Sequence, residues 1–308
     1  QWFAKLKSRS ELEHFYLPHA NNNEVELFVK RDDLIDPFIS GNKLRKLEGN
    51  LKAAKAACVA QILTFGGAFS NHLLASAAAA KAIDLPIIGR VRGEELTEKS
   101  NPILLKCHQL GMVLNFVNRS DFKACKYQSG LSPHQDKPTW FIPEGGANPE
   151  GILGCTEIYK EAVAQNHNLH FDAVFLAQGT TTTSLGILAS IPPTTQLFVV
   201  PVLKGFNSLQ EMQALAKKAK QNPTTAHLEF PFSQVRVLDT HHHGGYAKTT
   251  PELMDFIKSF NDTQQFPIEP TYTGKALLAL NSQLPHLQAK SVLFIHTGGV
   301  QTTKKILP

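Results

Sequence analysis

The sequence predicts an α/β protein whose parallel sheets are covered by helices on both faces. From about residue 43 onward, segments rich in helix formers alternate with short apolar runs. Those runs are continuously apolar instead of alternating with polar residues, which indicates strands buried on both faces of a parallel sheet. The 308 residues are enough for one large domain or for two packed domains.

The first half of the chain begins this alternation with KLRKLEGNLKAAKAA, residues 43–57, which is rich in helix formers. A buried strand is expected at 60–65, and a glycine turn then leads into an alanine-rich helix within 66–83. Further strands are expected at 85–93, 112–117 and 138–146, and further helices at 95–111 and 151–167. Residues 118–138 give no reliable prediction.

The second half contains four more apolar runs, with a helical segment between each run and the next. These strands are expected at 172–179, 195–203, 233–239 and 291–299. The chain has no internal repeat, low-complexity tract or obvious linker. Composition alone therefore does not locate a domain boundary.

Composition and charge exclude several classes of protein. The formal net charge of +5 is mildly basic, but Lys and Arg are scattered, so we expect no nucleic-acid partner. The four cysteines lie far apart and form no CxxC pair, which argues against a zinc site and a disulfide framework. No apolar stretch approaches membrane-spanning length, and the first residues contain none of signal-peptide length. We therefore expect a cytoplasmic protein without a membrane partner.

Loops that follow the strands carry the chemistry, because ligands of parallel α/β sheets bind beyond the carboxyl ends of the strands. In FGGAFSNH, residues 65–72, two glycines precede Ser70 and Asn71 at the expected start of a helix. Glycines let a ligand approach the backbone, and a Ser/Asn cap with free N–H groups can hold an anion. An ordinary capped helix start would look the same.

Two further loops have a similar character. AQGTTTTSLG, residues 177–186, opens a helix with four threonines whose hydroxyl and N–H groups suit a phosphate. It matches neither the P-loop nor GxGxxG, and a threonine-rich cap with solvated hydroxyls is the alternative. FIHTGGVQ, residues 294–301, ends the last strand with glycines that can simply form a turn.

Lys43 is the candidate for covalent chemistry. A lysine can form an imine with an aldehyde cofactor when desolvation or neighbouring cations lower its pKa, and Arg45 and Lys46 are neighbours in sequence. A lysine at a helix start is, however, ordinarily solvated. The local pattern alone favours that ordinary interpretation.

Several stretches taken together resemble a known family. In chain order they are KRDDL, SGNKLRKLE, FSNH, IPEGGANPEGILG, YTGKALLAL and FIHTGG. They are similar to the signature stretches of the pyridoxal-phosphate (PLP) family that contains D-cysteine desulfhydrase and 1-aminocyclopropane-1-carboxylate (ACC) deaminase, over about residues 26 to 300. The resemblance implies the tryptophan synthase β-subunit-like fold (PLP fold type II), with two open, twisted, mainly parallel sheets covered by helices.

This resemblance also implies a domain division and an assembly. A larger PLP-binding domain would comprise residues 1–45 plus 158–308, and a smaller α/β domain residues 46–157, with the active site in the cleft between them. The family is also expected to form homodimers and to act on a small amino acid.

The resemblance assigns roles residue by residue. Lys43 matches the lysine that carries PLP and moves protons at the substrate, and Lys46 matches a lysine near the phosphate. Ser70, Asn71 and His72 match the stretch that holds the substrate carboxylate and the ring hydroxyl. The phosphate cup would comprise Gly179, Thr180, Thr181, Thr182 and Thr183, where the family usually has more glycine. Arg45 is assigned no role in the site, and we expect it to be an ordinary solvated cation.

Two tyrosines are further candidates for the site, whereas a run of three histidines is not. Tyr246 and Tyr272 match active-site tyrosines, although Ala247 replaces a usual glycine; each tyrosine could instead be a core aromatic with a bonded hydroxyl. His241 to His243 are adjacent, and adjacent histidines rarely point at one ion, so we expect solvent-exposed loop histidines and no metal site.

Thr273 distinguishes two reactions on this scaffold. ACC deaminases carry glutamate at the matching position, where a carboxylate would keep the pyridine nitrogen protonated, whereas the desulfhydrase-type members carry threonine. A hydroxyl makes the ring a weaker electron sink, which suffices for β-elimination because the leaving group takes the electrons. The sequence therefore favours a D-cysteine desulfhydrase-type lyase that forms pyruvate, ammonia and sulfide. ACC deamination to 2-oxobutanoate is the alternative, and the threonine-rich loop leaves open a non-catalytic small-molecule-binding protein.

Overall fold

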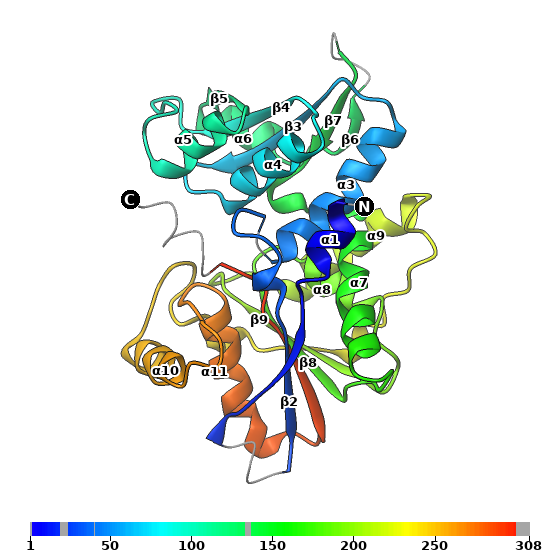
Figure 1. The fold of residues 1–308 in the computed structure, drawn as a ribbon, viewed down its shortest axis with the longest axis vertical. Coiled ribbons are helices and arrows are strands. Elements are labelled where there is room, and N and C mark those ends of the chain that lie inside the picture. The colour runs from blue at the N-terminus through cyan, green and yellow to red at the C-terminus, as the bar shows by residue number, and fades with distance from the viewer. Residues whose placement is uncertain (1, 19–23, 40, 133–136, 300–308) are drawn as a thin grey trace.

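Two sheets lie one above the other along the long axis of the molecule in the computed structural model, which describes residues 2–18, 24–39, 41–132 and 137–299 (Figure 1). The larger sheet has the strand order β1-β2-β11-β8-β9-β10, and the smaller sheet the order β5-β4-β3-β7-β6. Among the strand pairs of the described residues, only β1–β2 and β6–β7 are antiparallel. The predicted fold of two mainly parallel sheets is therefore confirmed.

The strands of the two sheets come from different parts of the chain. Those of the larger sheet are β1 (Leu12–Phe15), β2 (Glu26–Lys30), β8 (Ala173–Gln178), β9 (Gln196–Pro201), β10 (Val235–Val237) and β11 (Ser291–Ile295). Those of the smaller sheet are β3 (Gln61–Gly67), β4 (Ile87–Arg92), β5 (Val113–Val117), β6 (Gly130–Ser132) and β7 (Thr139–Ile142). The expected domain limits stay a prediction.

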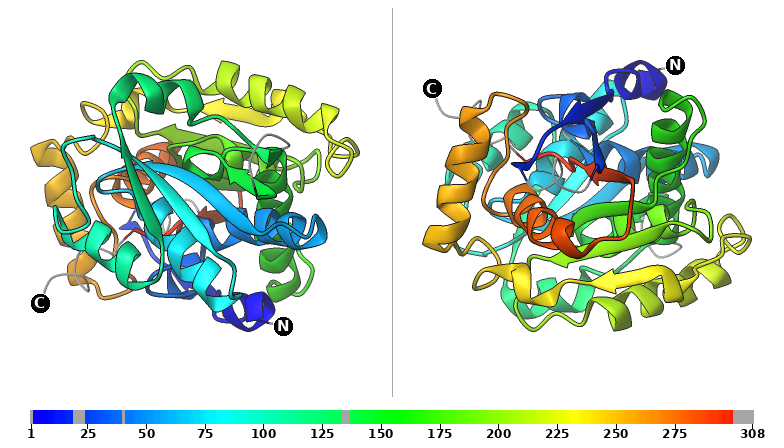
Figure 2. Two further views of the ribbon diagram at one scale, coloured as in Figure 1. Left: turned by 90° about the horizontal axis from the view of Figure 1, so that it is seen from above. Right: turned by 90° about the horizontal axis from the view of Figure 1, so that it is seen from below.

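Helices cover both faces of each sheet, as the two end-on views show (Figure 2). They are α1 (Trp2–Lys7), α3 (Asn42–Ala56), α4 (Asn71–Ala82), α5 (Pro102–Gln109), α6 (Arg119–Cys125), α7 (Pro149–Gln165), α8 (Thr182–Leu188), α9 (Ser208–Gln221), α10 (Pro251–Asp262) and α11 (Thr273–Gln283). One apolar core joins the larger sheet to α10 and α11, and a second joins its other face to α7, α8 and α9. In the described part of the chain, no helix is both long and apolar enough to cross a membrane.

The predicted elements agree with the structure best where strands are short and wholly buried. The structure differs in three places. The helix expected at 95–111 starts only at Pro102, because Asn101 caps it and the residues before it form turns. The unassigned stretch 118–138 contains α6 and β6. The N-terminal region, with α1 and the antiparallel pair β1–β2, was not predicted at all.

Helix α3 packs against both halves of the molecule. Leu44, Leu47 and Leu51 lie in the apolar core of the smaller sheet. Its opposite side meets α7 so closely that a Cβ on Gly154 would lie 1.9 Å from the carbonyl oxygen of Arg45. Glycine at this crossing therefore sets how near α3 can lie to α7.

Candidate active site

A cavity of about 460 Å³ opens where the carboxyl ends of strands from both sheets face each other. Loops after β3, β7, β8, β9 and β11 contribute to it, as does the first turn of α3. Among the predicted site residues, its lining includes Lys43, Lys46, Ser70, Asn71, His72, Gly179, Thr180, Thr181, Tyr246 and Tyr272. Thr182, Thr183 and Thr273 lie behind this lining and are buried.

The first turn of α3 is held against the loop that follows β11. Gly41, the N-cap of α3, has φ +63°, and a Cβ there would lie 1.8 Å from the carbonyl oxygen of Thr297. Only glycine combines this conformation with so close an approach. The Asn42 amide then donates to the hydroxyl of Thr183 at 3.0 Å. These contacts fix where Lys43 enters the cavity.

Two lysine amines from α3 are desolvated in this cavity. Lys46 Nζ donates to Thr180 Oγ1 at 2.9 Å, which joins α3 to the threonine loop. Burial, followed by the charge of Lys43, lowers the pKa of Lys46 to about 7. Burial also lowers the pKa of Lys43, with an opposing effect from Cys155. Both amines thus lose protons more readily than ordinary lysines do.

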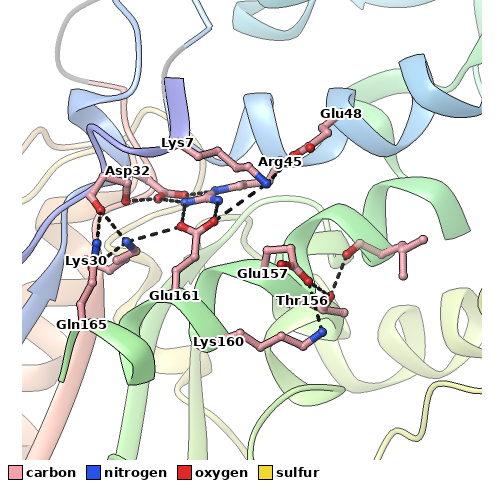
Figure 3. A network of polar contacts seen from close by, with 12 residues as sticks. Lys7, Lys30, Asp32, Arg45, Glu48, Thr156, Glu157, Lys160, Glu161 and Gln165 are labelled. Atoms are coloured by element: carbon pink, nitrogen blue, oxygen red, sulfur yellow. Dashed lines mark hydrogen bonds and ion pairs between the residues drawn. The ribbon is translucent and has the colours of Figure 1, made fainter. Parts of the chain in front are cut away.

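Arg45 is buried and paired, so the expectation of a solvated cation is wrong. Its guanidinium has no exposed surface and binds Asp32 and Glu161, each through two hydrogen bonds (Figure 3). Lys30 pairs with the same Glu161 at 3.5 Å. The successive side chains of a helix point in different directions, which sequence adjacency conceals. Arg45 ties α3 to the short 3-10 helix Asp32–Leu34 that follows β2, and to α7.

Ser70, Asn71 and His72 form the start of α4 beside the lysines. Ser70 is the N-cap, and its hydroxyl accepts the Leu73 N–H at 3.3 Å. His72 Nε2 lies 2.9 Å from Thr64 Oγ1, and Thr64 donates its own proton to the carbonyl of Ile142 at 3.0 Å. The hydrogen-bond pattern therefore assigns the ring proton to Nε2 of His72.

The other ring nitrogen of His72 is a buried acceptor. Nδ1 has no hydrogen-bond partner among the residues that the structure describes. Burial, followed by the charges of Lys43 and Lys46, lowers the pKa of His72 to about 3. His72 is therefore neutral at physiological pH and presents a lone pair instead of a positive charge.

Hydroxyls of the threonine loop are largely engaged within the protein. Thr182 Oγ1 donates to the carbonyl of Gly146 at 3.4 Å, and Thr183 Oγ1 accepts from Asn42. Thr180 is bonded to Lys46. The first turn of a helix still leaves backbone N–H groups without intrahelical partners, so the loop offers an anion its backbone more than its side chains.

Tyr246 and Tyr272 meet at one side of the cavity, with ring centroids 6.0 Å apart and ring planes at 73°. Burial raises the pKa of Tyr272, and Tyr246 adds to the effect, so its phenol stays protonated at neutral pH. Tyr246 is 54% exposed. Ala247, which replaces a glycine of the family pattern, adopts a left-handed φ of +55° that favours glycine.

Glu269 is a neighbour of Thr273 that the sequence did not point out. Its carboxylate accepts the backbone N–H groups of Thr271, Tyr272 and Thr273 and the Thr273 hydroxyl at 3.2 Å. Thr273 Oγ1 in turn accepts the Glu269 N–H at 3.0 Å. The EPTYT spacing, an acid four residues before the threonine, was the available signal. A carboxylate therefore stands behind this hydroxyl.

The histidine run points in three directions. His241 Nε2 lies 3.0 Å from Ser282 Oγ, His242 Nδ1 accepts the Gly244 N–H, and His243 Nδ1 lies 3.0 Å from Thr250 Oγ1. All three are half-buried, so the expectation of solvent-exposed rings is wrong. Lys275, which was also overlooked, is buried and donates to the carbonyl of Gly245 at 2.7 Å, which holds this loop to α11.

Comparison with known proteins identifies the family. The sequence pattern described as pyridoxal-phosphate dependent enzyme matches residues 13–298. The chain belongs to the PLP-dependent enzymes. It is 30% identical over 304 residues to a Pyrococcus furiosus protein provisionally assigned as an ACC deaminase, covering 94% of this chain and 89% of that one. It is 27% identical to a Yersinia pestis D-cysteine desulfhydrase over 288 residues, covering 89% and 86%.

A solved structure extends the likeness to three dimensions. The crystal structure of an ACC deaminase homologue superposes with a TM-score of 0.77 at 24% identity, covering 99% of this chain and 98% of that one. At this identity the likeness concerns the fold. It agrees with the fold class that the sequence predicted.

Residues of the cavity fit the PLP cofactor that the family uses. An aldehyde requires an amine, and Lys43 is a desolvated amine in the lining. A phosphate requires cations and N–H donors, which Lys46 and the threonine loop provide side by side. Facing them, Gly145 leaves room that a Cβ would fill to within 2.9 Å of Thr180. The donor set and the shape of the cavity both suit the group.

Proposed function

We propose that this PLP-dependent enzyme removes the α-proton of a small D-amino acid and expels its β-substituent, acting as a D-cysteine desulfhydrase. D-cysteine and water would give pyruvate, ammonia and sulfide. PLP, when bound, supplies a sink for the electron pair left on the α-carbon. The observation that carries the proposal is that the side chain at position 273 is a hydroxyl with no charge of its own.

The carboxylate of Glu269 lies behind Thr273, but it does not take the place of a carboxylate at position 273 itself. Three backbone N–H groups already bind that carboxylate, and the hydroxyl separates it from whatever contacts Thr273 on the other side. The position thus offers a protonated ring nitrogen weaker support than a carboxylate in direct contact would give. A reaction with a good β-leaving group requires less of that support.

Four groups of residues would divide the work. Lys43 would carry the cofactor and take the α-proton, since burial favours its neutral amine. Lys46 and the backbone of 179–183 would hold the phosphate. Ser70 and Asn71 would hold the substrate carboxylate and the ring hydroxyl. Tyr272, which stays protonated, would donate a hydrogen bond to the departing thiolate, with Tyr246 beside it.

ACC deamination is the second candidate, because the Pyrococcus relative carries that assignment and Glu269 brings a carboxylate near Thr273. Keto-acid release from D-cysteine, L-cysteine, D-serine and ACC separates the two functions. Pyruvate from D-cysteine should form fastest, and faster 2-oxobutanoate release from ACC would replace the proposal. Thr273→Glu should shift the ratio toward ACC, whereas Thr273→Ser, which keeps the hydroxyl, should leave it unchanged.

Cofactor attachment at Lys43 has its own test. Protein reconstituted with PLP should absorb near the visible edge, and Lys43→Ala should abolish this band. Borohydride reduction should attach the cofactor covalently to the wild-type chain but not to this variant. A band that persists in Lys43→Ala would remove Lys43 from this role. Sedimentation of the reconstituted enzyme would test the homodimer that the family resemblance implies.

A further inference from the structure

A second cavity of about 460 Å³ is lined mainly by cations. Its lining comprises Arg92, Arg119, Phe122, Lys123, Lys126 and Tyr127, and we call it the basic hollow. These residues come from the end of β4, from α6 and from the two residues that follow α6. Lys126 and Tyr127 also line the active-site cavity, so the two cavities share a wall.

The basic hollow lies at the ligand-binding edge of the smaller sheet. Arg92 is the last residue of β4 and stands opposite Gly67 of β3 and Val117 of β5. All three strands are parallel, and their carboxyl ends are where ligands of such sheets bind. A Cβ on Gly67 would lie 3.3 Å from Nη2 of Arg92. The hollow therefore opens beside the loop that leads to Ser70.

Of the four cations that line the hollow, Lys126 is paired with Glu144, whereas the other three have no carboxylate partner among the described residues. Among the described residues, no carboxylate lies within 4 Å of the side-chain nitrogens of Arg92, Arg119 or Lys123, and the guanidinium of Arg92 stands 5.7 Å from the centre of the Phe122 ring. Asp121, the acid within α6, accepts a hydrogen bond from Asn118. Like charges gathered around one cavity create a positive potential that attracts anions.

We propose that the basic hollow binds a small anion that carries two or more negative charges on phosphate or carboxylate groups. Arg92 and Arg119 supply planar donors that suit such oxygens in pairs, and Lys123 adds a point charge. Lys126 couples the hollow to the active site, because its ammonium pairs at 3.0 Å with Glu144, which also lines the active-site cavity. An anion that draws Lys126 toward the hollow weakens this ion pair.

The same anionic chemistry can come from two sources. A free metabolite can occupy the hollow as an effector, or an extended amino-acid substrate can place a distal phosphate or carboxylate there through the shared wall. The second source rests on the proposed function, whereas the first needs only the cofactor-loaded protein.

Calorimetric titration of the PLP-loaded enzyme with inorganic pyrophosphate tests the site itself. The cofactor fills the phosphate cup, so added anion reports on other sites. Arg119→Gln/Lys123→Gln should weaken binding at least about tenfold, the loss expected when a charge-assisted hydrogen bond is removed. Lys217→Gln/Lys218→Gln removes two exposed charges on α9, far along the chain, and should leave binding unchanged. All four residues are exposed, so the variants should fold.

Three results would overturn the proposal: no binding by the wild-type enzyme, equal affinity in both double variants, or equal weakening in both. Steady-state kinetics then distinguishes a free anion in the hollow from a distal group of the substrate. If a substrate group occupies the hollow, Arg119→Gln/Lys123→Gln raises the KM for O-phospho-D-serine but not for D-cysteine. If a free anion occupies it, both KM values stay unchanged and pyrophosphate alters D-cysteine turnover only in the intact hollow. Calorimetry needs no turnover, so failure of the proposed reaction would be distinguishable.

Discussion

Replacing Arg45 with methionine should destabilise the enzyme more than any surface ion-pair substitution. The Arg45 side chain is fully buried and makes hydrogen bonds of 3.2 and 2.8 Å to Asp32 and of 2.6 and 2.7 Å to Glu161. Methionine keeps a long apolar stem and removes every donor. The effect then depends on how well each carboxylate is compensated afterwards.

The two carboxylates differ in this respect. Asp32 is fully buried and keeps the Ser10 hydroxyl at 2.6 Å, with Lys30 as the nearest remaining cation. Glu161 is 26% exposed and keeps Lys30 at 3.5 Å, so water compensates it in part. Removing one partner of a buried pair typically costs about 3–5 kcal/mol. We expect a loss near the lower end, about 3 kcal/mol, and a Tm lower by about 5 °C.

Thermal unfolding of the PLP-loaded enzyme, followed by circular dichroism, measures this loss. Lys160→Met is a matched control, because it breaks the exposed pair with Glu157 on α7 and should change stability by less than about 0.5 kcal/mol. Asp32→Asn/Arg45→Met should recover part of the loss, since no buried charge then stands alone. Equal Tm values for Arg45→Met and Lys160→Met would refute the reasoning, as would a double variant no more stable than Arg45→Met.

The pH dependence checks the same interaction. Although burial alone would raise the pKa of Asp32, Arg45 and Ser10 lower it below its usual value. A depressed carboxyl pKa contributes stability above the pKa of the unfolded chain, and this contribution is lost as pH falls through the folded-state pKa. The stability of Arg45→Met and wild-type enzyme should therefore converge in acid. A difference that stays constant with pH would assign the loss to packing alone.

Three further predictions concern the site. Because Lys46 has a pKa of about 7 and ionises near 10.5 when unfolded, the cofactor-free protein should gain stability as pH rises between these values, while its calorimetric affinity for inorganic phosphate falls. Lys46→Gln should weaken both trends without removing them, because burial also lowers the pKa of Lys43; trends of wild-type size in the variant would contradict this. Ala247→Gly should raise stability by about 0.5–1 kcal/mol in thermal unfolding, since it relieves a left-handed strain of about 1–2 kcal/mol and adds less unfolded-state entropy; a lower Tm would contradict this. Gly41→Ala should lower Tm and PLP occupancy far more than Gly205→Ala, because both have positive φ but only Gly41 faces a carbonyl at 1.8 Å; equal losses would show that conformation alone matters.

Much of the fold could be predicted because its central strands are buried on both faces. The runs that became β3, β8, β9 and β11 are mainly apolar, and this pattern can be recognised without knowing which strands pair with them. The strand β1 is four residues long, has the adjacent polar residues Glu13 and His14 at its centre, and depends on pairing with β2, so its local pattern is weak. Pairing across distant segments cannot be read from either segment alone.

For the site, too, features that lie within short sequence motifs could be predicted, whereas features that depend on tertiary packing could not. Lys43, Lys46 and Ser70 lie within short motifs, and they gather around one cavity as the resemblance implied, although their roles stay predictions. The direction of a side chain was not predictable from adjacency: Arg45 turns toward α7, and the Thr183 hydroxyl turns toward Asn42. Direction follows from the packing of helices against one another, which is a tertiary property.

The packing of α3 against α7 has a consequence for how the enzyme opens. Lys43 and Lys46 on α3 are joined to the threonine loop by the Lys46–Thr180 bond and through α7, which packs against α8. The start of α4, with Ser70 and Asn71, lies on the smaller sheet without such a bond to that loop. A rocking motion of the smaller sheet would therefore displace Ser70 and Asn71 relative to the threonine loop, while the Lys46–Thr180 bond and α7 restrain α3. In the proposed roles, such a motion would loosen the groups for the substrate carboxylate more than those for the phosphate.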